Sequence, residues 1–257
     1  MLDLYADKMR ARSASVLVSL DTRLDRILVL WLIFAGLIAA ARIEFSARPP
    51  GGAALSTFAS YALVVIAPLA STVLALRWFK NGHLQPQPFT RLARVGKWRS
   101  VSRSEAARHP LYGTTGIMVS LLVGMMVNVP VRTAEYLAAM PPIPAVAPNW
   151  LSALHLAMTF DVVAFGSLYM IAFVAALRRA PLFPRLLVAI WLSDLVMQIV
   201  TAKLVVAAGP LPEAVAVALQ TMLTGNVKKV LISMALWLPY LLLSERVNVT
   251  FRRRVPA

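Results

Sequence analysis

Two carboxylates interrupt long apolar segments of the chain and are the first candidates for chemistry. Asp161 lies within the apolar segment 154–177, and Asp194 lies within the segment 186–206. An unpaired ionised carboxylate in hydrocarbon costs several kcal/mol, so each must pair with a cation, face water or hold a proton. Gln198 follows Asp194 by one helical turn and forms a secondary polar pair with it.

A lysine is the expected partner of Asp161. The apolar segments that carry the two acids form an antiparallel hairpin, and placing Leu177 opposite Leu187 sets its register. Asp161 is then level with Lys203, so we predict an ion pair between them, with Lys229 as the second choice. The candidate polar layer at this depth consists of Asn128, Asp161, Lys203, Lys228 and Lys229.

Two interpretations of this polar layer stay open. It can be a proton or substrate-headgroup site in an outward-facing cavity, or a satisfied interhelical ion pair that fixes the packing. We prefer the packing interpretation. The same two interpretations apply to the pair formed by Asp194 and Gln198.

The sequence predicts no catalytic, metal-binding or cofactor-binding residues. His83, His109 and His155 lack a metal-like spacing with acids, and no zinc-protease, serine-hydrolase or nucleotide-binding motif occurs. The chain has no cysteine, which excludes disulfides, zinc–thiolate sites, iron–sulfur clusters and cysteine nucleophiles. We therefore do not expect an enzyme.

These polar residues must be positioned by helices in a membrane. Hydrophobic residues make up 59% of the 257 residues, charged residues make up 14%, and the mean hydropathy is +0.71. The apolar residues come in long blocks, which predicts an all-α, polytopic fold rather than a barrel. Six transmembrane helices are expected, at about residues 27–41, 59–76, 114–131, 154–177, 186–206 and 230–243. The last is short, so its helix should begin earlier, with Lys228 and Lys229 reaching towards the interface.

Composition also divides the chain into parts. A basic connector separates a two-helix membrane part from a four-helix membrane domain, and both ends carry short polar segments. The N-terminal segment is either a short amphipathic helix on the membrane surface or a disordered terminus. The expected parts are 1–26 (N-terminal segment), 27–80 (two helices), 81–110 (connector), 111–251 (four helices) and 252–257 (tail).

The distribution of basic residues predicts the orientation in the membrane. The segments before the first helix, between the second and third, between the fourth and fifth, and after the sixth hold 20 of the 26 Lys and Arg residues. By the positive-inside rule, both termini are then cytoplasmic. This topology accounts for the net charge of +15 without nucleic acid as a partner. The same basic segments suit anionic lipid or an acidic protein at the cytoplasmic face.

The C-terminal segment carries a recognisable motif. The run Trp237-Leu-Pro239-Tyr240, followed by Ser244-Glu-Arg246-Val247-Asn-Val-Thr250-Phe251, resembles the W-x-P-Y … S-x-R-V-x-x-T-F ending of the DUF2569 family of bacterial inner-membrane proteins. Gly113-Thr-Thr-Gly116 and Phe183-Pro184-Arg185-Leu186 resemble the entries to the first and third helices of that family. The family's usual G-G-W reads Thr115-Gly116-Ile117 here, and Glu245 and Asn248 stand where basic residues are commoner.

The resemblance covers about residues 111–251 and implies a four-helix membrane fold at a bacterial inner membrane, with no assigned activity. From the residues alone, Trp237 and Tyr240 pack or anchor the last helix, Pro239 kinks it, and the following segment carries positive charge out of the bilayer. We expect a non-enzymatic accessory, scaffold or assembly subunit that contacts lipid and other membrane proteins. The alternatives are a small transporter or lipid-headgroup translocase that uses the layer around Asp161, and, third, a membrane enzyme acting on lipid.

Topology reporters test the predicted orientation. Fusions after Lys80, after Arg178 and at the C-terminus should report the cytoplasm, because basic segments are retained on that side. Fusions near Pro144 and Pro212 should report the periplasm. A periplasmic C-terminus would contradict the prediction, since it requires an odd number of crossings or an inverted insertion.

Overall fold

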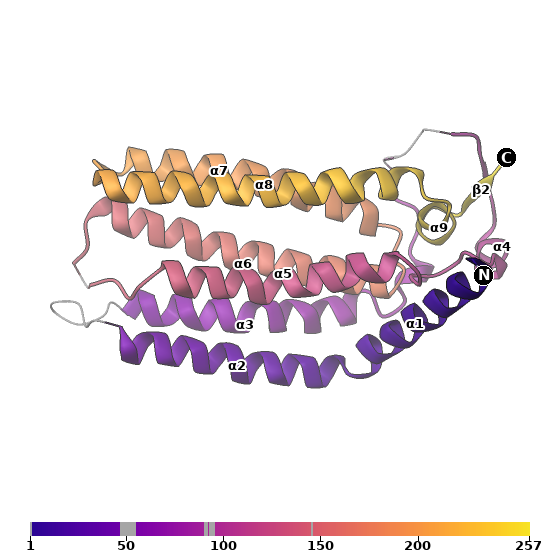
Figure 1. The fold of residues 1–257 in the computed structure, drawn as a ribbon, viewed down its shortest axis with the longest axis horizontal. Coiled ribbons are helices and arrows are strands. Elements are labelled where there is room, and N and C mark those ends of the chain that lie inside the picture. The colour runs from indigo at the N-terminus through magenta and orange to yellow at the C-terminus, as the bar shows by residue number, and fades with distance from the viewer. Residues whose placement is uncertain (1, 47–54, 90–91, 93–95, 145) are drawn as a thin grey trace.

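The computed structural model describes residues 2–46, 55–89, 92, 96–144 and 146–257, with side chains from residue 11 onwards. Long helices that lie alongside one another dominate it (Figure 1). They are α1 (Leu2–Thr22), α2 (Leu24–Phe45), α3 (Leu55–Trp78), α5 (Met118–Ala139), α6 (Asn149–Leu177), α7 (Phe183–Ala207) and α8 (Glu213–Leu243). The all-α, multi-pass fold expected from the sequence is confirmed.

Five of the described helices are long and apolar enough to cross a membrane: α2, α3, α6, α7 and α8. The third predicted span corresponds to α5, which has 22 residues and packs against α6. Arg132 and Glu135 interrupt its apolar sequence. The number of six crossings therefore stays a prediction.

The structure moves several helix boundaries. The third span was expected at 114–131, but α5 runs from Met118 to Ala139, so Arg132 lies inside the helix rather than beyond its end. The expectation failed because a charged residue was assumed to end the helix, whereas the helix continues past it. α8 begins at Glu213, well before the lysines, as predicted, and Pro239 lies within it. Residues 48–52 are rich in Pro and Gly, which predicts a loop between the first two spans, and they lie outside the described residues.

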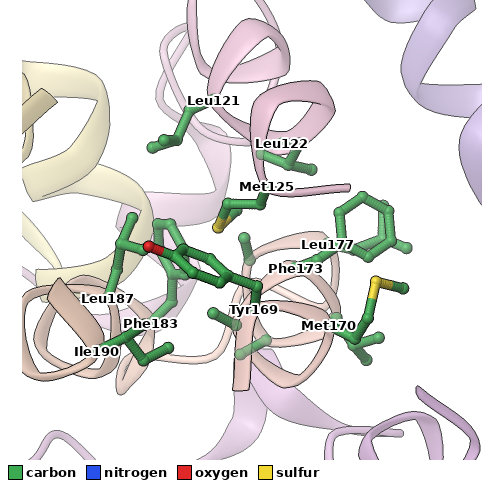
Figure 2. Close-up of a cluster of buried hydrophobic side chains, with 14 of the residues drawn as sticks. Leu121, Leu122, Met125, Tyr169, Met170, Phe173, Leu177, Phe183, Leu187 and Ile190 are labelled. Atoms are coloured by element: carbon green, nitrogen blue, oxygen red, sulfur yellow. The ribbon is translucent and has the colours of Figure 1, made fainter. Parts of the chain in front are cut away.

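α6 is the central helix of the bundle and packs against α3, α5 and α7. Figure 2 shows Met125 of α5 near Tyr169 and Phe173 of α6, with Phe183 and Leu187 of α7 on the same cluster. Large buried side chains of this kind exclude lipid and water, and their close packing gives the bundle a defined arrangement.

A small residue lets α3 approach α6 closely. A Cβ atom built on Gly166 would lie 3.5 Å from Pro68 Cγ and 3.9 Å from Val129 Cγ1. Close backbone approach at small residues is a common way for membrane helices to associate, since lipid supplies no hydrophobic driving force between them. α3 is thus joined to the rest of the bundle mainly through α6.

α2 lies at the side of the bundle and exposes apolar side chains. Trp31 on its inner face donates a hydrogen bond from Nε1 to the carbonyl oxygen of Val65, at 2.9 Å. The outer face shows large exposed hydrophobic residues, as expected for a helix in contact with lipid: Val29, Leu30, Ile33, Phe34, Leu37 and Ile38. α1 precedes it, so the N-terminal segment is helical over 2–22 rather than disordered.

The basic segments meet at one end of the bundle, where both termini also lie (Figure 1). Strand β1 (Trp98–Ser100) of the connector pairs antiparallel with β2 (Arg254–Pro256) of the C-terminal tail. Arg178, between α6 and α7, pairs with Asp21 of α1 at 3.2 Å. We call this the basic end; its described parts are residues 11–23, 79–89, 92, 96–117, 178–182 and 244–257.

Short elements complete the basic end. They are η1 (Gly82–Leu84), α4 (Arg103–Arg108), α9 (Glu245–Val247) and the π-helical turn η2 (Asn248–Arg252). The side chain of Ser102 caps α4 by accepting a hydrogen bond from the backbone N–H of Glu105, at 3.1 Å. The connector is therefore folded against the tail in its described part, with the small two-stranded sheet as the only pairing of strands found there.

Candidate functional site

Arg132 of α5 lies between the two acids that the sequence singles out. Its Nη1 is 2.9 Å from Oδ2 of Asp161 on α6, and its Nη2 pairs with Oδ2 of Asp194 on α7. The side chain of Arg132 is 12% exposed, that of Asp161 is 6% exposed, and that of Asp194 is fully buried. One guanidinium thus ties three helices together inside the bundle.

Two amides extend this cluster to a fourth helix. Gln198 of α7 donates hydrogen bonds from Nε2 to Oδ1 of Asp161, at 3.2 Å, and to Oδ1 of Asp194, at 3.1 Å. Asn226 of α8 donates from Nδ2 to Oε1 of Gln198, at 3.3 Å. The residues form a connected network over α5, α6, α7 and α8, and each carboxylate accepts bonds on both of its oxygens, as a buried carboxylate requires.

Aromatic rings further hold the guanidinium in place. The Cζ atom of Arg132 lies 5.2 Å from the centroid of the Phe165 ring and 5.8 Å from that of the Tyr169 ring. Both rings belong to α6, one helical turn apart, and a guanidinium over an aromatic face is attracted to it in a water-poor site. Its position is set by ring faces as well as by carboxylates.

The cluster carries one more negative charge than positive charge when all its groups are ionised. Asp161 and Asp194 together supply two negative charges, and Arg132 supplies one positive charge. A net charge in a buried site is costly, so the cluster favours an additional proton or an external cation. Within the described residues, no group of three or more His, Asp or Glu side chains is placed to hold a metal ion.

A cavity of about 720 Å³ opens onto this cluster between α5, α6, α7 and α8. Arg132 and Asp161 line it, and so do Asn128 and Asn226. Its walls are otherwise largely apolar or aromatic and include Met125, Val131, Met158, Tyr169, Leu187, Trp191, Met222, Val230 and Trp237. The arrangement has the features of a ligand site, a mostly apolar hollow with a few convergent polar groups.

An ion pair links α5 and α8 at the edge of this cavity. Glu135 of α5 pairs with Lys229 of α8, and both side chains line the cavity while remaining about half exposed. Because α8 packs mainly on α7, this pair is a direct polar link from α8 to α5. Exposed ion pairs are weak, so it can open at little cost.

The predicted ion pair between Asp161 and Lys203 is wrong, since Asp161 pairs with Arg132. Lys203 follows Asp194 by nine residues, which at 100° per residue places it on the opposite face of α7, where it is exposed. The hairpin register gave the depth of Lys203 but not the direction of its side chain. Lys228 is also exposed, whereas Lys229 pairs with Glu135 rather than with Asp161. Of the predicted layer, the structure brings Asn128, Asp161 and Lys229 to the cavity.

Arg132 is the functional candidate that the sequence reasoning missed. The expected third span ends at Val131, where the apolar segment ends, and this leaves Arg132 outside the helix. The spacing of Asn128, Arg132 and Glu135 is four and then three residues, which places all three on one helical face. A polar stripe with that spacing could have indicated that the helix continues and that its polar face points into the bundle.

The family-like motifs meet at the basic end. Gly113 donates its backbone N–H to Thr250 Oγ1 at 2.9 Å, and Arg246 Nη1 donates to Thr115 Oγ1 at 2.9 Å. The rings of Phe183 and Phe251 lie 5.1 Å apart. Segments that are far apart in sequence therefore close the same end of the bundle.

The remaining motif residues serve the end of α8. The rings of Trp237 and Tyr240 are 6.0 Å apart and nearly perpendicular, while Pro239 lies between them in the helix. Ser244 ends α8, and its backbone N–H donates to the carbonyl oxygen of Tyr240. Val247 is fully buried just beyond it. The motif thus packs and terminates the last helix.

These features define a multi-pass helical membrane protein with a charged network and a cavity inside its bundle. A family model described as "Protein of unknown function (DUF2569)" matches residues 113–252, more than half of the chain. The chain belongs to the DUF2569 family. Comparisons with curated proteins and with solved structures found no match.

Replacing Arg132 and Lys229 in turn should separate the buried network from the edge pair. Arg132→Gln leaves two buried carboxylates without their cation, which costs about 3 kcal/mol or more and should lower the melting temperature by roughly 6 °C or more. Lys229→Gln removes an exposed pair, so it should lower the melting temperature by about 2 °C or less. Thermal unfolding in mild detergent measures both, and equal shifts would contradict the assigned roles.

Proposed function

We propose that the protein binds an amphipathic molecule with a positively charged headgroup, as a small transporter or lipid-headgroup translocase. The observation that carries this proposal is the cavity that opens onto Asp161 and Arg132, beside a buried excess of negative charge. A purely structural ion pair gives no reason for a hollow of this size next to it. An ammonium group in the hollow would neutralise the excess charge.

The lining of the cavity supports an amphipathic ligand. Its apolar walls match hydrocarbon or ring groups, while the polar residues lie together around Asp161. Tyr169, Trp191 and Trp237 supply aromatic surfaces, which attract ammonium groups through their ring faces. A ligand with one cationic end and one apolar end matches both parts of the lining.

The placement of the cavity also supports exchange of the ligand. The cavity is bounded by α5 and α8, which the exposed pair of Glu135 and Lys229 links directly. Release of that pair would let α8 move away from α5 while it keeps its packing on α7. A bound headgroup could then leave along the gap between the two helices, as translocation requires.

The orientation predicted from charge belongs to the same proposal. With cytoplasmic termini in a bacterial inner membrane, the basic end faces the cytoplasm and the loops that follow α5 and α7 face the periplasm. Anionic lipid headgroups would then surround the basic end and hold it at the cytoplasmic surface.

An accessory or assembly role is the second candidate, and the basic end favours it. There the N-terminal helix, the connector and the tail form a folded surface rich in arginine, with Arg99 and Arg103 exposed. Such a surface suits an acidic partner protein or anionic lipid. A lipid-modifying enzyme ranks third, because we identify no set of convergent catalytic groups among the described residues.

Lipid retention tests the first candidate against the second. The purified protein is exposed to equal amounts of phosphatidylethanolamine and phosphatidylglycerol with matched acyl chains, and bound lipid is measured by native mass spectrometry. We expect preferential retention of phosphatidylethanolamine, because only its headgroup carries an ammonium. Asp161→Asn should reduce that preference by about tenfold, the effect of losing a charged hydrogen-bond partner.

Asp25→Asn is the matched control, since it removes an exposed acid of α2 outside the cavity and should leave the preference unchanged. Asp194→Asn provides a second variant at the cluster. Absence of any preference in the wild type would overturn the proposal. A second polypeptide retained in equal amount, together with no lipid preference, would instead support the accessory role.

A further inference from the structure

Arg252 is a buried arginine whose hydrogen-bonding capacity is largely unused. The residue is 5% exposed and lies in η2, just after the last α-helical turn. Its Nη1 donates to Oδ1 of Asn248 at 3.2 Å. Its Nε and Nη2 atoms are buried and have no hydrogen-bond partner within the described part of the chain. An unsatisfied charged donor in a dry site is costly and calls for a ligand.

Two further arginines lie close to Arg252. Burial, together with the positive charges of Arg185 and Arg254, lowers the pKa of Arg252 from its usual value to about 10. Arg185 and Arg254 are partly exposed, and Arg185 donates from Nη1 to the carbonyl oxygen of Pro181 at 3.2 Å. The carboxylate of Glu245 in the neighbouring α9 lies 3.5 Å from His109. Three like charges therefore gather around the unused donors of Arg252, and an anion bound there would reduce their repulsion.

The sequence motifs build this arrangement. The rings of Phe183 and Phe251 lie 5.1 Å apart and are tilted by 43°, and this contact holds the start of α7 against η2, which places the neighbouring Arg185 and Arg252 close together. Arg253 then adopts a left-handed backbone conformation, with φ of 53°, which turns the chain into β2. Arg254 is the first residue of that strand and so remains beside Arg252. Arg185 lies two residues beyond Phe183, and Arg252 and Arg254 lie one and three residues beyond Phe251.

We propose that Arg252, together with Arg185 and Arg254, forms a phosphate-binding site at the basic end of the bundle. The unused Nε and Nη2 donors of Arg252 lie on one edge of its planar guanidinium, which matches two oxygens of a phosphate group. The partly exposed Arg185 and Arg254 supply a route to that edge and add favourable charge. This site is separate from the cavity and does not depend on the function proposed for it.

The phosphate can belong to free inorganic phosphate or to a lipid headgroup, and both offer the same oxygens. Arg185 lies in the first turn of α7, where a membrane helix begins at the basic end. Lipid headgroups lie at that depth if α7 crosses the membrane. The experiment therefore needs one arm for each source.

Thermal stabilisation of the detergent-purified full-length protein tests the site. One arm titrates sodium phosphate against sodium chloride at constant ionic strength, and the other titrates short-chain phosphatidylglycerol against a matched uncharged glycolipid. We expect a specific rise in melting temperature in at least one arm. Arg252→Gln should weaken the apparent affinity for that probe by about tenfold or more, because charged hydrogen bonds are lost.

Arg103→Gln is the matched control, since it removes an exposed positive charge from the same end and should leave the affinity within about twofold of wild type. If Arg252→Gln does not fold, the partly exposed Arg254→Gln replaces it and should weaken the affinity in the same direction. A response to inorganic phosphate assigns the site to the free anion, and a response to the lipid alone assigns it to headgroups. No response in either arm, or an equal loss in the Arg103 control, would overturn the proposal.

Discussion

A guanidinium inside an apolar bundle needs negative charge close to it, and much of this structure depends on how Arg132 meets that need. Its two partners come from α6 and α7, so the three helices must keep a fixed depth and rotation relative to one another. Gln198 and Asn226 extend the same constraint to α8. Hydrophobic packing alone is less directional in lipid, where side chains and solvent are equally apolar. The polar network therefore gives the bundle its register.

The network also forms one side of the cavity inside the bundle. Arg132 reaches its partners from α5, and α8 is joined to the cluster through an amide and to α5 through the exposed pair of Glu135 and Lys229. The space between α5 and α8 is lined by the charged cluster at one side and by apolar and aromatic residues elsewhere. The basic end, by contrast, is closed by family motifs that form hydrogen bonds and aromatic contacts with one another. The cavity is thus the region that we propose admits a ligand, whereas the basic end holds the helices together and exposes positive charge.

Periodicity and composition predicted most of the fold, because blocks of apolar residues reveal membrane helices directly. They also identified Asp161 and Asp194, since acids in such blocks are conspicuous. They failed for Arg132, because charge content was used to end α5 while the spacing with Asn128 and Glu135 was not considered. They failed again for Lys203, because depth along a hairpin does not determine which face of a helix a side chain occupies. The cavity and the arginine cluster at Arg252 depend on tertiary contacts between distant segments, which one sequence does not contain.

A double-mutant cycle on Arg132 and Asp194 tests the central interaction most directly. Unfolding free energies are measured in detergent for wild type, Arg132→Gln, Asp194→Asn and the double variant. If the two side chains pair inside the bundle, the double variant loses less stability than the two single variants together, with a coupling of about 1 kcal/mol or more. Effects that add within about 0.5 kcal/mol would mean that Arg132 and Asp194 do not interact, which would contradict the account.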